Sequence, residues 1–470
     1  MSRTAVKFLI LGAGPTALGA AHRLRELGQE DFLLLEAAGQ AGGLAASFKD
    51  EKGFVWDIGG HVQFSHYDYF DDLMARVFEP GGWLKHQRES WAWMDGRFVP
   101  YPVQNNIRYL SQEKAWSCLD GIITANLESA AAPATPRNFK EWILSRFGSG
   151  LAETFMFPYN FKVWAYPLEE LSHHWVGDRV AITDLRRVSK NLLLGLDDLS
   201  WGPNNTFQFP RHGGTGAIWE SVADLVGRRK IRLNTRVRQV NWGERSVVCA
   251  DGTEFQYEQL ITTIPLDDLV GILHPARPEL VAAATGLKYS SSNIVGLGLT
   301  GPQPPAIKTK CWMYFPEDNC PFYRVTVFSN YSPNNVPDFP RTWSLMTETS
   351  ESPCKPVDQA RLLEDTIQGC LNTGLIGSRD QIVSTWSCRA AHGYPTPSLG
   401  RDAALAAIQP ALEEAQIFSR GRFGAWKYEV SNQDHSLMQG VELVERLVSG
   451  TPEVTVNDHE RANRGIRRAK

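Results

Sequence analysis

Small residues and one carboxylate near the start of the chain have the spacing of a nucleotide-binding turn. Gly12 and Gly14 follow the apolar run 8–11, and Ala17 takes the third small position of a GxGxxG/A pattern. Glu36 ends the next apolar run, about 20 residues further on. Glycines let the backbone approach a pyrophosphate, a helix start attracts the anion, and the acid can bind ribose hydroxyls. The pattern therefore predicts a bound adenine dinucleotide.

A second glycine pair identifies the dinucleotide. The stretch "EAAGQAGGLAAS" places Gly42 and Gly43 shortly after the acid. It resembles the extended FAD signature of the amine oxidase-like flavoproteins, in which a second glycine turn lies along the pyrophosphate and flavin. "LITTIPLDDL" (260–269) resembles a strand and proline turn of the same superfamily. We therefore expect FAD.

The stretch "FVWDIGGHVQFSHYDYF" (54–70) raises the question of why two glycines precede a histidine. In such flavoproteins this segment passes the isoalloxazine ring. Gly59 and Gly60 would let the backbone approach the flavin without a side-chain clash, and His61 would lie at the flavin edge. A turn with a capping histidine is the alternative.

Two arginines are suited to a diphosphate. Arg179 lies in "VGDRVA" and Arg324 in "FYRVTVF", where a strand would place Arg324 on one face with Phe322 and Thr326. A guanidinium group forms paired hydrogen bonds to phosphate oxygens. For either arginine alone, a salt bridge is the competing interpretation.

Long motifs in order along the chain resemble the UDP-galactopyranose mutase family, in its eukaryotic, fungal and trypanosomatid branch. They are "GGHVQFSHYDYFDD", "VPYPVQNNI", "PYNFKVWAYP", "VGDRVA", "WGPNNTFQFPRHGGTGAIW", "KCWMYFPEDNCPFYRVTVFSNYSP", "HGYPTPSL" and "RGRFGAWKYEVSNQDHSLMQGVE". The resemblance implies an isomerase that interconverts UDP-galactopyranose and UDP-galactofuranose without net redox change. Reduced FAD would supply N5 as the nucleophile at the anomeric carbon, with NADPH or NADH as reductant.

The resemblance also implies the site residues. His61, Arg179 and Arg324 would be catalytic. The FAD-binding set would be Gly12, Gly14, Ala17, Glu36, Gly42, Gly43, Leu44, Gly59, Gly60, His61, Arg88, Val237, Asn432, Gln433 and Ser436. The substrate-binding set would be Tyr101, Gln104, Phe155, Asn160, Trp164, Arg179, Asn204, Trp312, Tyr314, Arg324, Tyr331, Tyr394 and Tyr428.

Three other functions are open at this point. An amine-oxidase-like oxidase or desaturase would have an aromatic cage at the flavin and no diphosphate-binding arginines. A mutase could act on another nucleotide sugar, such as UDP-arabinopyranose or a deoxysugar nucleotide. A flavin-bound but inactive scaffold is the third, and the intact catalytic positions argue against it.

Periodicity indicates the elements that must position these residues. Apolar runs 8–11 and 32–35 predict buried parallel strands around a helix. "NFKEWILSRFG" predicts a helix with Asn138 as N-cap and Gly148 after its last turn. Strand patterns around Asp251-Gly252 predict a hairpin. The fold class is α/β: a discontinuous Rossmann-like FAD-binding domain (1–95, 205–290, 385–470), a helical substrate domain (105–204) and an antiparallel sheet domain (291–384, with about 96–104).

Composition narrows the class of protein. A net charge of −4 over 470 residues excludes a broadly basic nucleic-acid binder. No stretch approaches the ~20 apolar residues of a membrane span, so we expect a soluble, cytoplasmic protein that acts on a UDP-sugar. Seven scattered cysteines without CxxC spacing predict reduced thiols. No metal site is expected, because His61, His66, His173 and His174 lack acids or cysteines at ligand spacing. A homo-oligomer remains open.

Overall fold

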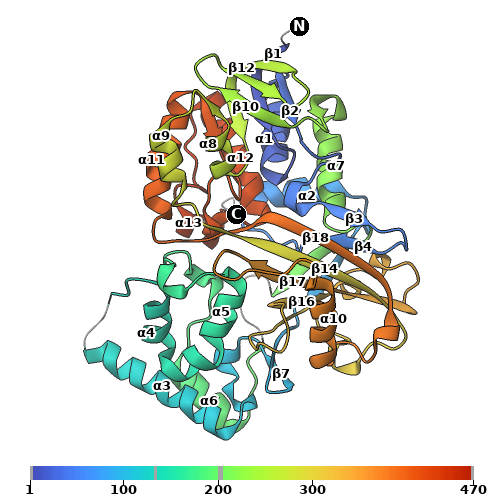
Figure 1. Ribbon diagram of the computed structural model, residues 1–470, viewed down its shortest axis with the longest axis vertical. Helices are drawn as coiled ribbons and strands as arrows, with labels where there is room; N and C mark the ends of the chain where they lie inside the picture. The colour runs from blue at the N-terminus through green and yellow to red at the C-terminus, as the bar shows by residue number, and fades with distance from the viewer. Residues whose placement is uncertain (1–3, 132–134, 200–204, 467–470) are drawn as a thin grey trace.

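The described residues of the computed structural model are 4–131, 135–199 and 205–466. Figure 1 shows three parts: a sheet with covering helices at the top, a second sheet in the middle, and a group of helices at the lower left. No described helix has the length and apolar character needed to cross a membrane.

The first sheet joins segments from three distant parts of the chain. Its path is β13-β10-β11-β12-β1-β2-β9, and β19 also pairs with β12. Pairs of β1 with β2 and β12 are parallel, whereas β10–β11 and β11–β12 are antiparallel. The strands are β1 (Thr4–Leu11), β2 (Phe32–Leu35), β9 (Ile231–Arg232), β10 (Val237–Asn241), β11 (Ser246–Cys249), β12 (Glu254–Thr262), β13 (Leu273–His274) and β19 (Ile417–Ser419).

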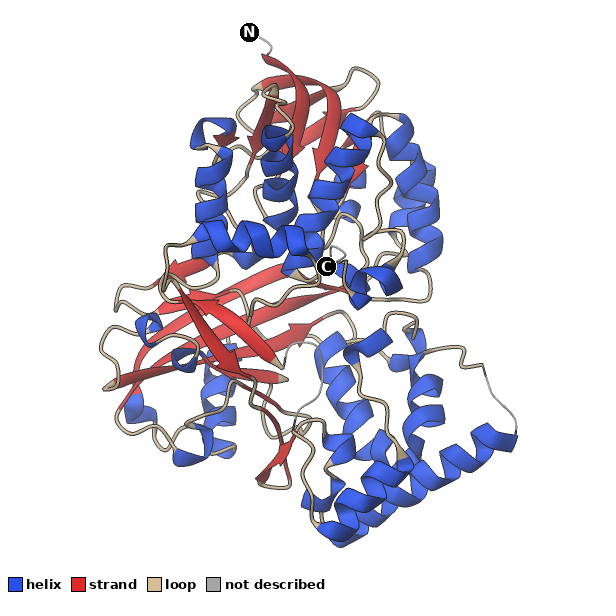
Figure 2. Ribbon diagram, turned by 180° about the vertical axis from the view of Figure 1, so that it is seen from behind, coloured by secondary structure: helices blue, strands red, loops and turns tan. Residues whose placement is uncertain are grey.

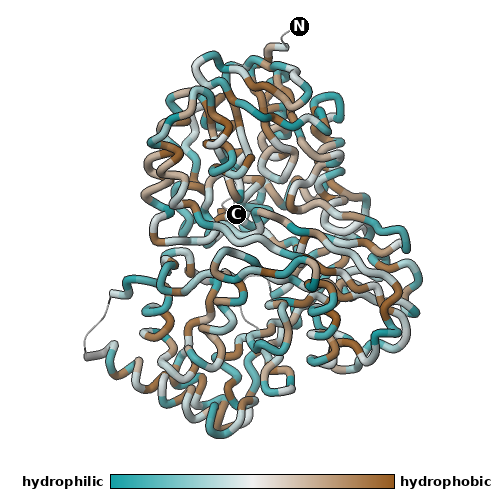
Figure 3. Tube along the Cα trace, viewed as in Figure 1, coloured by the Kyte–Doolittle hydropathy of each residue, from teal (hydrophilic) through white to brown (hydrophobic). Residues whose placement is uncertain are grey.

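Helices cover both faces of this sheet, as the continuous apolar runs predict. Phe8 and Ile10 of β1 face a core shared with α1, α2, α7 and α12, while Leu9 and Leu11 face α8, α9 and α11. Figure 3 shows hydrophobic segments along these strands and hydrophilic ones at the outer loops. The helices are α1 (Pro15–Glu26), α2 (Asp68–Val77), α7 (Gly216–Val226), α8 (Leu266–Gly271), α9 (Pro278–Ala284), α11 (Arg401–Glu414), α12 (Gln433–Ser449) and, near the C-terminus, α13 (His459–Arg464).

Close packing of α1 against α12 depends on glycine. A Cβ on Gly19 would lie 2.5 Å from the Leu437 carbonyl oxygen, and one on Gly440 would overlap the Thr16 carbonyl. The two backbones therefore approach more closely than larger side chains would allow. The N-termini of both helices reach the same cavity, because Pro15 and Gln433 both line it.

The second sheet has the order β18-β14-β17-β16-β15-β6-β7 (Figure 2). Its pairs are antiparallel except β15–β6, which is parallel. One face packs on α10 (Leu362–Asn372). The strands are β6 (Ser90–Met94), β7 (Arg97–Pro100), β14 (Tyr289–Thr300), β15 (Trp312–Tyr314), β16 (Arg324–Val327), β17 (Thr342–Glu351) and β18 (Ile382–Pro395).

Two small antiparallel sheets of two strands each complete the described strands. They are β3 (Ser47–Lys49) with β4 (Val55–Asp57), and β5 (Trp83–Gln87) with β8 (Thr206–Pro210). Phe54 and Trp56 pack on β14 where it carries Gly296 and Gly298, whose added Cβ atoms would lie 2.5 Å and 2.7 Å from these rings. Glycine on β14 thus seats β4 on the second sheet and places the following turn, 58–61, at the sheet surface.

The helical part contains α3 (Gln112–Ala131), α4 (Phe139–Leu151), α5 (Phe157–Trp164) and α6 (Leu185–Leu194). Asn138 caps α4 as predicted, since its side chain accepts from the Glu141 N–H at 2.9 Å. Gly148 does not end the helix: it has φ +71°, and the helix resumes to Leu151. A Cβ on Gly148 would overlap the Gly121 backbone of α3, so contact between the helices explains both the glycine and the kink.

The predicted α/β fold class is confirmed. The domain boundaries stay predictions, and the strands indicate where to adjust them. The boundary at 385 falls inside β18, and the one at 95 separates β6 from its partner β7. The predicted hairpin at Asp251-Gly252 is the connection between β11 and β12, with Gly252 at φ +85°.

Candidate active site

The first glycine turn is held in the shape that a dinucleotide needs. Gly12 has φ +107°, and a Cβ there would overlap the Thr263 hydroxyl. Helix α1 starts after Gly14 with no side-chain cap, which leaves its first N–H groups for an anion. Glu36 accepts from the N–H groups of Ala13 and Ala38, both at 2.7 Å. Its carboxylate thus holds the turn, and its further lone pairs remain available to a ribose.

The second glycine turn lies directly against the first. The Gly42 N–H donates to the Ala13 carbonyl at 2.9 Å, and Gly42 has φ +114°. A Cβ on Gly43, which has φ +55°, would lie 3.3 Å from the Gly14 Cα. The two turns therefore form one wall of bare backbone, as the second glycine pair predicts.

A single large cavity runs along this wall and on to the second sheet. Its volume is about 1650 Å³, which is more than one small ligand fills. Most of the predicted site residues line it: Gly12, Gly14, Glu36, Gly43, Leu44, Gly59, Gly60, His61, Arg88, Tyr101, Arg179, Val237, Trp312, Tyr314, Arg324, Tyr331, Tyr394, Tyr428, Asn432, Gln433 and Ser436.

The remaining predicted residues lie outside the cavity lining. Ala17 is buried in α1, and Gly42 lies within the second turn. Gln104 donates to the Ala181 carbonyl at 2.8 Å, and Asn160 donates to the Met156 carbonyl at 2.7 Å. Phe155 and Trp164 approach the cavity through other aromatic rings, Phe155 stacking on Tyr159 at 5.3 Å and Trp164 meeting Tyr428 at 4.8 Å. Asn204 lies outside the described residues.

The turn before His61 is fixed by a carboxylate. Gly59 has φ +90°, and the Gly60 N–H donates to Glu348 Oε1 at 3.0 Å. A Cβ on Gly60 would lie 2.7 Å from the Thr326 hydroxyl, so the second sheet leaves no room for one. Burial lowers the pKa of His61 to about 4, and its ring is therefore neutral at neutral pH.

Arg324 forms a buried pair with Glu348 across β16 and β17. Its Nε donates to Oε1 at 2.7 Å and its Nη2 to Oε2 at 2.8 Å. Burial opposes both charges, yet Arg324 lowers the pKa of Glu348, and Glu348 raises the pKa of Arg324 well above its ordinary value. The Nη1 group of Arg324 makes no hydrogen bond to any described residue, although Arg324 lines the cavity.

Three arginines converge on Tyr428. Burial raises the pKa of this tyrosine, and the charges of Arg179, Arg422 and Arg324 oppose that shift. Arg179 donates to the Glu429 carbonyl at 2.5 Å and to Asn463 Oδ1 at 3.1 Å. Three guanidinium groups therefore lie near the point where the aromatic residues meet, although Glu348 pairs with Arg324, and such a cluster suits a dianionic ligand.

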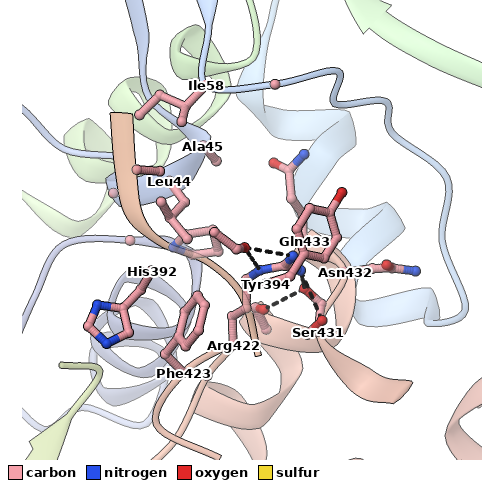
Figure 4. Close-up of a pocket in the computed structure, with 18 of the residues that line it drawn as sticks. Leu44, Ala45, Ile58, His392, Tyr394, Arg422, Phe423, Ser431, Asn432 and Gln433 are labelled. Carbon is pink, nitrogen blue, oxygen red and sulfur yellow. Dashed lines mark hydrogen bonds between the residues drawn. The ribbon is translucent and has the colours of Figure 1, made fainter. Parts of the chain in front are cut away.

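Sequence reasoning missed Arg422 and Glu348. Arg422 donates to the Ser431 hydroxyl at 2.9 Å and to the Gly393 carbonyl at 3.1 Å, and it lies over the Tyr394 ring (Figure 4). Its guanidinium thus links β18 to the segment before α12. The two arginines in "RGRFG" were a usable signal for Arg422. Glu348 gave none, because its partners are 24 and 288 residues away.

Helix α12 brings its N-terminus to the cavity, and Asn432 provides no side-chain cap there. Gln433 is fixed by Trp219, whose Nε1 donates to Gln433 Oε1 at 2.7 Å. Figure 4 shows Ser431, Asn432 and Gln433 around the same space as Leu44 and Ile58. The partial positive charge of this helix end therefore points at the region predicted to hold the flavin.

His66 does have an acidic partner, contrary to the expectation from sequence spacing. Its Nδ1 lies 2.7 Å from Asp434 Oδ2, and its ring stacks on His435 at 4.6 Å. Residues 368 positions apart cannot show ligand spacing in the sequence. The three side chains form a compact buried group behind the N-terminus of α12.

The residues present fit FAD. The bare-backbone wall and the uncapped start of α1 suit its pyrophosphate, and the Glu36 carboxylate suits its ribose. Ser292 also lines the cavity and has a buried hydroxyl with no partner among the described residues.

Comparisons with known proteins agree with this geometry. The flavin-containing amine oxidoreductase family matches residues 18–337. A crystal structure of reduced UDP-galactopyranose mutase is 46% identical, covers 98% of both chains and superposes with a TM-score of 0.94. An Exiguobacterium sp. 255-15 protein classed as a protoporphyrinogen oxidase covers 95% of this chain and 99% of its own at 15% identity and TM-score 0.71, which shows the fold alone.

A curated relative matches only a part of this chain. The protoporphyrinogen oxidase of Dictyostelium discoideum is 29% identical over 115 residues. This match spans 23% of this chain and 22% of that protein.

Proposed function

The chain belongs to the flavin-containing amine oxidoreductase family and, within it, to the UDP-galactopyranose mutases, and we propose on this premise that it interconverts UDP-galactopyranose and UDP-galactofuranose. The observation that carries the proposal is the pair of surfaces in one cavity: a bare-backbone wall suited to FAD, and converging arginines suited to a diphosphate. An oxidase acting on an amine would have no use for those arginines.

Arg324 and Arg179 bind the substrate diphosphate in this proposal. They come from different parts of the fold, Arg324 from β16 and Arg179 from the segment that follows the helices α3 to α5. Glu348 holds two donor groups of Arg324, so the Nη1 group is the part that can turn to a phosphate oxygen. Charge-assisted hydrogen bonds of this kind strengthen as UDP departs and its charge develops.

Reduced FAD, when bound, would supply N5 as the nucleophile that attacks the anomeric carbon. Around it, the Gly59-Gly60 turn provides the close backbone approach, and neutral His61 offers its backbone carbonyl rather than a charge. The N-terminus of α12 stabilises negative charge on the pyrimidine end. Tyr394 and Tyr428 add hydroxyl groups to the diphosphate pocket without adding charge.

The test is anaerobic turnover. Holoprotein is reduced once with dithionite, freed of excess reductant and incubated with UDP-galactofuranose, and UDP-galactopyranose is measured by chromatography. We expect many products per flavin with the flavin still reduced, and the oxidised holoprotein as the matched control should be inactive. One product per flavin with reoxidation would support an oxidase, and absence of UDP-galactopyranose would reject the proposed substrate.

Further features of the proposal come from the family resemblance. NADPH or NADH would reduce the flavin. The protein would act in the cytoplasm, in the synthesis of cell wall or glycoconjugates. Its partner in solution could be a second copy of the same chain. Each has a direct measurement: flavin bleaching by either nucleotide, localisation of the native chain, and mass in solution.

A further inference from the structure

The C-terminal segment 458–466 forms part of the cavity wall. It begins at Asp458, whose side chain accepts a backbone N–H from the first turn of α13 at 3.0 Å. It ends at Ile466, whose N–H donates to the His66 carbonyl at 2.7 Å. Between these two anchors, Asn463 lines the cavity. A segment fixed at both ends therefore presents one amide side chain to the site.

Both ends of this amide are used. Asn463 Nδ2 donates to the Glu429 carbonyl at 3.0 Å and to the His459 carbonyl at 2.7 Å. Because two carbonyl oxygens take the nitrogen, the oxygen of the amide must face the other way. There Asn463 Oδ1 accepts from Arg179 Nη2 at 3.1 Å. The same Nη2 also donates to the Glu429 carbonyl, so the three residues form a closed ring of hydrogen bonds.

Arg179 depends on such contacts, because its own element gives it little support. It ends the short 3-10 turn Gly177–Arg179, whereas Arg324 lies on a strand and is held by the carboxylate of Glu348. An arginine side chain has many rotamers to lose when it is fixed in one place. The Arg179 guanidinium nevertheless has a defined position, 5.8 Å from the centroid of the Tyr428 ring and at the cavity.

We propose that Asn463 is a positioning residue for Arg179 and that the C-terminal segment 458–466 thereby belongs to the diphosphate site, a role that rests on the proposed function. A protein contact that holds the guanidinium at the cavity reduces the side-chain ordering that nucleotide binding must otherwise supply. The amide is neutral, so it orients Arg179 without competing with a phosphate for its charge, as a carboxylate would.

The alternative is that Asn463 only fastens the C-terminal segment to the rest of the fold. Its loss would then disturb the cavity wall as a whole, and UDP affinity would fall by the same factor whether or not Arg179 is present. A positioning residue acts through its partner, so its loss matters only while the partner is there. The two roles therefore differ in the coupling between the two side chains.

The experiment is a double-mutant cycle on FAD-bound protein: wild type, Asn463→Ala, Arg179→Ala and the double variant, each titrated with UDP by calorimetry. We expect Asn463→Ala to raise the dissociation constant about 5-fold, a coupling common for residues in contact. In the Arg179→Ala background the same substitution should change it by less than about 2-fold. An equal factor in both backgrounds, or unchanged or tighter binding in Asn463→Ala, overturns the proposal.

A matched variant tests whether the effect is specific to Asn463. Asn457→Ala removes the same side chain just before α13, where its Nδ2 donates to the Glu453 carbonyl at 2.9 Å, and should keep wild-type UDP affinity. An equal loss in Asn457→Ala would overturn the specific role. If Asn463→Ala does not retain FAD, Asn463→Leu, which keeps the volume of the side chain, takes its place with the same expected loss. Wild-type protein that does not bind UDP would refute the nucleotide-sugar function itself.

Discussion

Arg324→Met should lower both stability and UDP affinity, for separate reasons. The substitution removes the cation from Glu348, which stays almost fully buried with 2% of its side chain exposed. Breaking a buried pair in this way costs about 3–5 kcal/mol in the free energy of unfolding. The same change removes charge-assisted hydrogen bonds to the diphosphate, each worth ~1.5–3 kcal/mol, so UDP affinity should fall at least ~10-fold.

A second substitution separates the two effects. Glu348→Gln in the Arg324→Met background removes the unpaired charge, so most of the lost stability should return. UDP affinity should stay low, because no guanidinium has been restored. The four proteins form a double-mutant cycle in which we expect a coupling energy of about 2–3 kcal/mol in stability, toward the upper end for residues in contact.

The assay is urea unfolding at a fixed excess of FAD, followed by circular dichroism, with UDP titration on the same preparations. FAD must be fixed because a ligand that binds only the folded state adds stability by mass action. A stability loss below about 1 kcal/mol in Arg324→Met would show that the pair is not desolvated. Near-normal UDP affinity in the double variant would remove Arg324 from the diphosphate site.

Three further outcomes follow from the same structure. Gly12→Ala should largely abolish FAD binding, because its Cβ would overlap Thr263. The control Gly28→Ala also has positive φ, at +69°, but open space around it, and should retain FAD, as measured by absorbance at matched protein concentration. Equal FAD contents in the two variants would contradict the role of the Gly12 turn in FAD binding. Burial raises the pKa of Asp57 from 3.8 to about 7, so between these values the folded chain keeps a proton that the unfolded chain has lost. The contribution of Asp57 to the free energy of unfolding is therefore complete below pH ~4 and is lost as the pH rises through 7. In urea unfolding, the free energy of unfolding of the wild type should therefore fall by up to about 4 kcal/mol more than that of Asp57→Asn between pH 4 and pH 8. An equal decline in the two proteins would disprove the pKa shift. Arg179→Ala should weaken UDP binding at least ~10-fold while leaving FAD in place, because Arg179 lines the cavity near Tyr428 and is not part of the two glycine turns. Unchanged UDP titration would exclude Arg179 from the diphosphate site.

Local patterns predicted the two glycine turns, whereas their contacts to FAD stay a prediction. Glycines, an apolar run on each side and a carboxylate at fixed spacing are consequences of one short turn, so the sequence contains them side by side. The structure shows this turn, with Gly12 at positive φ and the Ala13 N–H donating to the Glu36 carboxylate. The fold class followed for the same reason, since both faces of β1 are buried by helices.

Long-range pairings were outside the reach of the sequence. Nothing near Gly60 points to Glu348, and nothing near His66 points to Asp434, because strand order and helix packing alone bring these residues together. Gln104 shows that a motif does not determine which partner its own side chain contacts. The resemblance implies that Gln104 binds the substrate, which stays a prediction. In the structure its amide donates to the Ala181 carbonyl, a contact that depends on a neighbouring segment rather than on its own motif.

The sheet that carries the cofactor turn has a consequence for protein synthesis. Strand β1 leaves the ribosome before β12 and β19, which complete the sheet and follow some 250 and 410 residues later in the chain. Helix α12, on which α1 packs through Gly19 and Gly440, is later still. The nascent segment that contains β1 therefore keeps part of its apolar surface uncovered until α12 has been synthesised. A truncated chain that ends before residue 433 would lack one wall of the cavity and should depend on chaperones rather than on FAD for its solubility.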